Sequence, residues 1–190
     1  MSTEARLHQI VRDVVPLDSS VARAARDALD AKTKPRGSLG RLERLAAQIA
    51  SVRGTVRPTP LDPVVVVAAG DHGIVREAVS AYPREVTGQM LANFAGGGAA
   101  VAVLCRNAGA GLVVADAGVV APPTVPGLRD LSLGQGTANA AEGPAMERAV
   151  AVEGIVRGAA LGRELGEAGA GVVALGEMGI GNTTVAAALT

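Results

Sequence analysis

The sequence has few aromatic side chains, a single cysteine and no excess of charge of either sign. Tyr82 and Phe94 are its only Phe, Tyr or Trp residues, so a pocket for a flat ligand must be built mainly from aliphatic side chains, methionine and backbone. One cysteine, Cys105, excludes an internal disulfide framework and is typical of a reducing compartment. We therefore expect a cytoplasmic protein.

Charge and hydropathy exclude two further classes of partner. The 18 basic and 18 acidic residues cancel, so the strongly basic face that binds nucleic acid is not indicated. The longest strongly apolar run, VVVVAAG at 64–70, is much shorter than the roughly 20 residues that span a bilayer. The N-terminus is charged throughout and lacks the apolar core of a signal peptide. We expect neither a nucleic-acid partner nor membrane insertion.

Helical patterns fill the N-terminal part of the chain. Asp18 is a predicted cap, and Val21, Ala25 and Leu29 then share one helix face.

A second helix is predicted from a cap at Ser38 to a stop at Gly54, with an apolar stripe that includes Leu39, Leu42 and Leu45. The proline-rich segment TVRPTPLDP follows this helix and is typical of a linker.

Three apolar runs predict strands buried on both faces of a parallel sheet, at 64–70, 111–118 and 171–176. Predicted helices lie between them, one from Pro83 to about Ala95, a second after GGG, and a third from about Pro144 to Ala168. This alternation predicts an α/β fold, with an open, mostly parallel Rossmann-like sheet, flanking helices and a small helical domain from the N-terminus.

We place a domain boundary in the linker. Residues 1–55 are predicted to be the N-terminal helices of the small domain, and residues 56–190 an incomplete α/β nucleotide-binding domain. Three strands are few for a sheet covered on both faces, and the sequence ends at Thr190, less than three turns into a new helix. We therefore expect an incomplete version of a longer protein.

The segment GEMGIGNTT at 176–184 lies between a predicted strand and a predicted helix, where free N–H groups and the helix dipole favour an anion. Gly176 and Gly181 have the spacing of a Walker A loop, but Asn182 stands where that loop has lysine. The loop therefore suits a monophosphate better than a triphosphate. Glu177 is unfavourable beside a phosphate unless it faces ribose hydroxyls or a proton in transfer.

Two other interpretations of this loop stay open. The glycines could simply form a tight turn from strand to helix. Gly179 and Gly181 also imitate a dinucleotide-binding fingerprint, although its third glycine is missing. That match would indicate a dinucleotide-dependent oxidoreductase.

A second group of candidate residues follows the first predicted strand. The helix after Pro83 places Val86, Gln89 and Met90 on one face, with Tyr82 at its mouth. Such a face suits a flat, mostly apolar heterocycle, although Val86 and Met90 are also typical of a helix that packs on the core.

Metal and hydrolase chemistry have little support. Asp71 and His72 are adjacent in sequence, and adjacent side chains rarely converge on one metal ion. With His8 as the only other histidine, a histidine-based zinc site is excluded, and we expect no metal. No G-x-S-x-G sequence is present to support a serine hydrolase.

The motifs together resemble the nicotinate-nucleotide:5,6-dimethylbenzimidazole phosphoribosyltransferase family. Six segments carry the resemblance in order, between Lys34 and Thr190: KPRGSLGRLERLA, AGDHGIVREAVSAYPREVT, ANFAGGGAAVAVL, ADAGV, GTANAAEGPAM and GEMGIGNTTVAAAL. The resemblance implies a pentosyltransferase that moves the phosphoribosyl group of nicotinate mononucleotide to dimethylbenzimidazole in cobalamin assembly. It also implies a homodimer that needs no cofactor.

The resemblance assigns roles to residues of both groups. The ribose and phosphate would be held by Glu177, Gly179, Gly181, Asn182 and Thr183. The base pocket would be lined by Tyr82, Val86, Gln89 and Met90. Asp71 and Ser80 are further candidate site residues without an assigned role. Some relatives have serine at the position of Tyr82 and glutamine at that of Met90, so the preferred base is open.

The family's proton-accepting glutamate is expected beyond Thr190, as is a lysine that helps to hold the phosphate. Glu177 is a secondary candidate for the base. A non-catalytic nucleotide- or base-binding module with the same fold is the alternative function.

Overall fold

The computed structural model describes residues 1–190, which form two compact units. One unit is Val11–Pro60, and the other joins Met1–Ile10 to Leu61–Thr190. The first ten residues thus group with the sheet rather than with the helices that follow them. The assignment of residues 1–55 to a small domain stays a prediction.

The unit Val11–Pro60 is built on helices α2 (Ser19–Asp30) and α3 (Arg41–Arg53). Asp18 caps α2 as predicted, because its side chain accepts a hydrogen bond of 2.7 Å from the Ser20 N–H. Gly54 ends α3 in the left-handed conformation, also as predicted.

The predictions for the start and the packing face of α3 were wrong. Its cap position is Gly40 rather than Ser38, without a side-chain hydrogen bond. Leu42 is 64% exposed, whereas Ala47 and Ala50 are buried in a cluster with Ala25. Small side chains let two helices approach closely, so α3 packs by its alanines and leaves its leucine stripe in solvent.

The larger unit contains a four-stranded parallel sheet in the order β3-β2-β1-β4. Its strands are β1 (Pro63–Gly70), β2 (Gly111–Gly118), β3 (Arg129–Asp130) and β4 (Val172–Met178). The three predicted strands and the open α/β class are confirmed. Strand β3 was missed because two exposed, charged residues carry no strand pattern.

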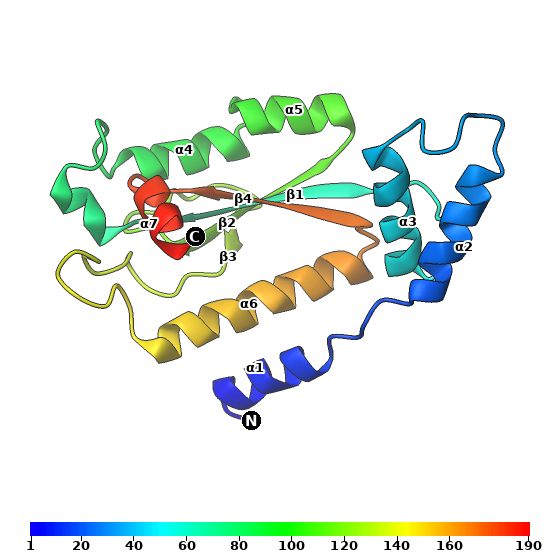
Figure 1. The fold of residues 1–190 in the computed structure, drawn as a ribbon. Helices are drawn as coiled ribbons and strands as arrows, with labels where there is room; N and C mark the ends of the chain where they lie inside the picture. Colours follow the sequence, from blue (N-terminus) through cyan, green and yellow to red (C-terminus); the bar gives the residue numbers. More distant parts are fainter. The chain divides into compact units, whose positions relative to one another are not determined.

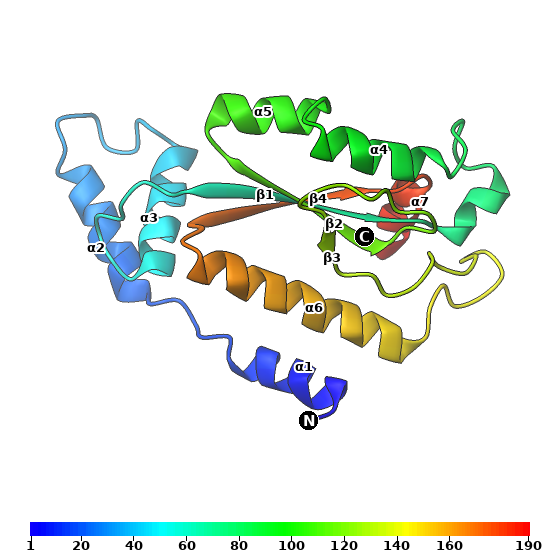
Figure 2. The same cartoon turned by 180° about the vertical axis from the view of Figure 1, so that it is seen from behind.

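Helices cover both faces of this sheet (Figures 1 and 2). Helices α4 (Val86–Ala95) and α5 (Ala100–Ala108) lie on one face, and α6 (Arg148–Glu167) lies on the other. Helix α1 (Thr3–Arg12) runs beside α6, where Glu153 bonds Thr3 and Arg6 at 3.2 and 3.3 Å. A short 3-10 helix, η1 (Gly73–Glu77), follows β1, and α7 (Asn182–Leu189) follows β4.

The main core lies between the sheet and helix α4. Leu91 and Phe94 of α4 are buried against Val67 of β1 and Val114 of β2. By length and composition the segment Val86–Ala108 could cross a membrane. It is instead two helices of 10 and 9 residues, each shorter than a bilayer requires, and Leu91 and Phe94 of α4 belong to the core.

Strand β4 forms one edge of the sheet and leaves apolar side chains in solvent. Leu175 is 85% exposed and Val172 is 41% exposed. An unpaired apolar edge favours pairing with another chain.

The substitution Leu175→Lys should reduce self-association, because a charged side chain on an edge strand opposes intermolecular pairing. The free energy of unfolding should change by less than about 0.5 kcal/mol, as expected for a surface position. Sedimentation velocity over a range of concentrations measures the first effect and urea denaturation the second. Val103→Lys, at an exposed position of α5, is the control. Equal self-association of the wild type and both variants would show that strand β4 does not mediate it.

Candidate functional site

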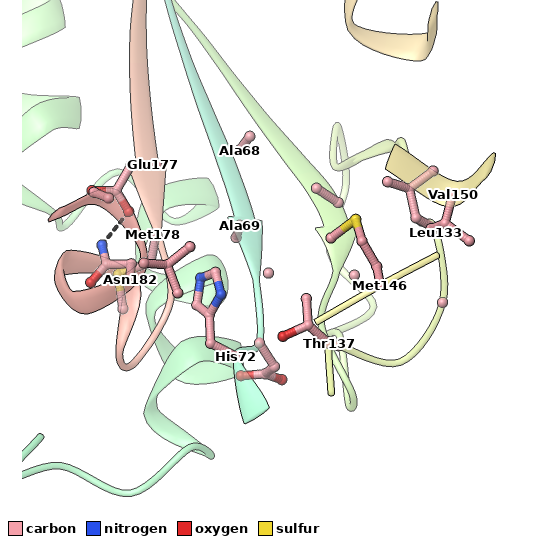
Figure 3. Close-up of a pocket in the computed structure, with 18 of the residues that line it drawn as sticks. Ala68, Ala69, His72, Leu133, Thr137, Met146, Val150, Glu177, Met178 and Asn182 are labelled. Carbon is pink, nitrogen blue, oxygen red and sulfur yellow. Dashed lines mark hydrogen bonds between the residues drawn. The ribbon is translucent and has the colours of Figure 1, made fainter. Parts of the chain in front are cut away.

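A cavity of about 330 Å³ opens at the carboxyl ends of β1, β2 and β4 (Figure 3). Pairing of Ala69 with Asp116 and with Met178 brings these three ends together. Ligands of open α/β sheets bind at this edge. The lining is largely apolar, with Ala68, Ala69, Met146, Val150, Met178, Val185 and Leu189 among its side chains.

The polar part of the cavity wall contains two carboxylates and no lysine or arginine. The carboxylates belong to Asp71 and Glu177, and His72, Thr137 and Asn182 supply neutral polar groups. An anion bound here must therefore be held by neutral N–H and O–H donors of this chain.

Asp71 ties together the segments around the end of β1. Its Oδ2 accepts a hydrogen bond of 2.8 Å from the Val120 N–H, its own N–H donates to Gly118 at 3.0 Å, and its carbonyl accepts from Thr137 at 3.0 Å. The residue is buried, and Oδ1 has no hydrogen-bond partner. Asp71 thus helps to hold the loops around the end of β1 through one carboxylate bond and two main-chain bonds.

His72 points from the end of β1 into the space between Glu177 and Thr137 (Figure 3). Its Nδ1 is buried without a hydrogen-bond partner. Burial lowers the pKa of the imidazole below its ordinary value, and the Glu177 and Asp71 carboxylates oppose this effect without overcoming it. Burial thus favours the neutral form of the His72 imidazole.

The Gly-rich loop connects β4 to α7 over Gly179–Gly181. A Cβ on Gly179 would collide with the Gly70 carbonyl oxygen, and Gly181 has φ +88°, so both positions require glycine. The Asn182 side chain donates a hydrogen bond to the Glu177 carboxylate at the wall of the cavity (Figure 3).

Of the five loop residues predicted to hold ribose and phosphate, only Glu177 and Asn182 line the cavity. Gly179 and Gly181 are buried in the turn between β4 and α7, and Thr183 is exposed on α7. The roles of all five in binding stay predictions.

Thr87 of α4 holds the Gly-rich loop and was not among the residues predicted from the sequence. It is fully buried, and its hydroxyl accepts a hydrogen bond of 3.1 Å from the Ile180 N–H in the middle of the loop. One turn of helix thus fixes a loop 93 residues later in the chain. A lone threonine on a helix face carries no sequence signal for such a contact.

A second missed segment, Gly134–Asn139, closes the other side of the cavity. The Thr137 hydroxyl accepts a hydrogen bond of 3.2 Å from the Gly73 N–H. Asn139 is buried and donates to Glu77 at 2.6 Å. The sequence indicates this region only through the motif GTANAAEGPAM of the family resemblance.

The residues predicted for base binding do not line this cavity. Tyr82 is 65% exposed, Gln89 is exposed, and Met90 packs against the core cluster beside Leu91. The Ser80 hydroxyl accepts a hydrogen bond of 3.2 Å from the Tyr82 N–H, which forms a local turn. The structure thus places this group outside the cavity, and its part in base binding stays a prediction.

A more polar cavity of about 390 Å³ adjoins the first, and Asp71, His72, Gly136 and Thr137 line both. Arg76 and Arg84 belong to its wall. No group of three or more His, Cys, Asp or Glu side chains is placed to hold a metal ion.

Comparison with known proteins matches residues 14–190 to a family model described as phosphoribosyltransferase. A Roseiflexus sp. (strain RS-1) nicotinate-nucleotide–dimethylbenzimidazole phosphoribosyltransferase is 46% identical over 184 residues, which are 96% of this chain and 52% of the relative. A Pseudomonas putida (KT2440) protein of the same name is 49% identical over 175 residues, 92% of this chain and 50% of the relative.

Solved structures agree with these relatives. The crystal structure of the Thermus thermophilus protein of that name has a TM-score of 0.86 and 46% identity, over 91% of this chain and 53% of its own. A second structure from that organism, called CobT, has a TM-score of 0.85. The chain spans about half the length of the curated relatives it matches.

The substitution Thr87→Val should destabilise the protein by about 1–3 kcal/mol, because it leaves the buried Ile180 N–H without an acceptor. Thr87→Ser keeps the hydroxyl and should cost less. Urea denaturation measures the loss, and hydrogen exchange of the Ile180 amide reports the local opening. Unchanged exchange at Ile180 in Thr87→Val would show that the hydroxyl does not hold the loop.

Proposed function

The chain belongs to the nicotinate-nucleotide–dimethylbenzimidazole phosphoribosyltransferase family, and we propose that the protein carries out this family's reaction. It transfers the phosphoribosyl group of nicotinate mononucleotide to 5,6-dimethylbenzimidazole, giving α-ribazole 5′-phosphate and nicotinate for the nucleotide loop of cobalamin. One observation carries the proposal, namely that the strand ends form a cavity in which polar loop groups face an apolar wall. A phosphoribosyl group and a flat ring need such a pair of surfaces.

The loop between β4 and α7 is proposed to hold the phosphate and ribose. N–H groups at the start of α7 favour a phosphate, and Asn182 in place of the Walker lysine fits a single phosphate group. Glu177 would accept hydrogen bonds from ribose hydroxyls, a role that explains a carboxylate in an anion-binding loop.

The reaction requires one new bond and one broken bond at ribose C1′. A benzimidazole nitrogen attacks C1′ from the face opposite the pyridinium, and the C1′–N bond pair leaves with nicotinate. The departing pyridinium is already activated, so the protein must mainly orient the two rings and accept the benzimidazole N–H proton.

We assign the proton acceptor to a glutamate in the part of the relatives that this chain does not span. Glu177 is the secondary candidate, because the other carboxylate of the cavity, Asp71, is buried and bonded to the Val120 N–H. Tyr82, Val86, Gln89 and Met90 are proposed to contribute to base selection, and the protein is proposed to be a cytoplasmic homodimer.

A non-catalytic nucleotide- or base-binding module remains the second candidate function. The observation that favours it is the shortage of carboxylate bases, since the cavity wall offers only one carboxylate without a backbone hydrogen bond. Such a module would bind nicotinate mononucleotide and release it unchanged.

Incubation with nicotinate mononucleotide and dimethylbenzimidazole should yield nicotinate and α-ribazole 5′-phosphate in equal amounts, as measured by mass spectrometry. Calorimetry with each compound alone separates binding from turnover. Binding of the mononucleotide without product would identify the non-catalytic module. Absence of both binding and product from folded protein would contradict the proposed function.

The substitution Glu177→Gln should weaken the binding of nicotinate mononucleotide about fivefold, because a neutral amide oxygen accepts hydrogen bonds from ribose less strongly than a carboxylate. The amide oxygen can still accept the bond from Asn182, so the loop geometry should persist. Glu167→Gln, at the exposed end of α6, is the charge-matched control. Equal affinities of both variants would exclude Glu177 from the ribose site.

A further inference from the structure

Two buried side-chain atoms of the described chain have no hydrogen-bond partner, and they belong to adjacent residues. They are Asp71 Oδ1 and His72 Nδ1, at the end of β1 on the wall of the cavity. Each buried polar group without a partner lowers the stability of the fold by about 1–3 kcal/mol. Such groups therefore often mark a functional site. The family resemblance assigns no role to either residue.

The surroundings of His72 determine which ring nitrogen carries the proton. Nδ1 is buried without an acceptor, and a buried N–H without an acceptor is rarer in proteins than an unpaired acceptor. Nε2 also makes no hydrogen bond within the chain, but it is not among the buried atoms. These surroundings favour the neutral ring with its proton on Nε2, which would present an N–H donor to the cavity.

The Nε2 atom lies against the Gly-rich loop. A Cβ on Gly179 would be 3.1 Å from Nε2, so the loop backbone passes directly over this edge of the ring. Glu177 and Asp71 are the charged groups near the ring. No lysine or arginine lines this cavity, so an anion held there would depend on neutral donors beside the loop.

We propose that His72 is a substrate-binding residue whose Nε2–H donates a hydrogen bond to a phosphate oxygen held at the loop Gly179–Asn182. This inference rests on the proposed function for the identity of the ligand, nicotinate mononucleotide. The neutral ring supplies a donor without a positive charge, which would otherwise pair with Glu177 and hold its carboxylate away from the ribose.

The chain contains only two histidines, so nitrogen-15 imidazole spectra report on His72 directly, with His8 as an internal control. The free protein should show His72 as the Nε2–H tautomer, with a pKa below the ordinary value of histidine. Addition of nicotinate mononucleotide should shift the His72 Nε2 signal and raise its pKa, because a nearby dianion favours the protonated ring. His8 should not respond.

Side-chain variants separate binding from packing. The amide nitrogen of His72→Gln can reach the position of Nε2, whereas that of His72→Asn reaches only the position of Nδ1. Affinity for the mononucleotide, measured by calorimetry, should fall about tenfold or more in His72→Asn, the size of one lost hydrogen bond to a charged group. His72→Gln should recover most of it. Equal losses in two stably folded variants would overturn the inference.

Amide signals of Gly179 and Gly181 distinguish failure of the inference from failure of the proposed function. If the mononucleotide shifts these amides but not His72, the inference is wrong and the proposed function stands. If inorganic phosphate shifts His72 and the mononucleotide shifts neither His72 nor the amides, His72 is an anion contact and the proposed substrate is wrong. If neither compound shifts either set of signals, both proposals are overturned.

Discussion

The parallel pairing of β1 with strands on both sides is the constraint on which the site depends. Because Ala69 pairs with Asp116 on one side and Met178 on the other, three segments far apart in sequence end at the same edge of the sheet. Asp71 and His72 follow the central strand, and the Gly-rich loop follows β4. A shift of one residue in either pairing would turn these side chains to the opposite face.

Two positions at this edge require glycine, because backbone segments approach each other closely there. Gly179 lies against the Gly70 carbonyl, and Gly73 lies against the backbone of Ala138. Helix α4 adds a further restraint through the bond between Thr87 and Ile180. The cavity is therefore held by main-chain packing and a few buried polar contacts, while Glu177, Asn182 and His72 line it.

The order and type of most elements could be predicted, because each pattern is local. The apolar runs predicted β1, β2 and β4. The cap at Asp18 correctly predicted the start of α2, and Gly54 correctly predicted the end of α3. The prediction was wrong where the packing of a helix differs from the face that its apolar pattern indicates. The leucines of α3 looked like a core face, but the smaller Ala47 and Ala50 are buried instead.

The sequence by itself determined the family, the open α/β class and the Gly-rich loop, since motif order and hydrophobic period do not depend on distant contacts. Only the tertiary structure decided which residues share a cavity. It joined Glu177 and Asn182 to His72 and Thr137, and it left Tyr82 and Gln89 outside. Helical spacing fixes which side chains share a face, but the packing of that face against the sheet decides whether it meets ligand, core or solvent.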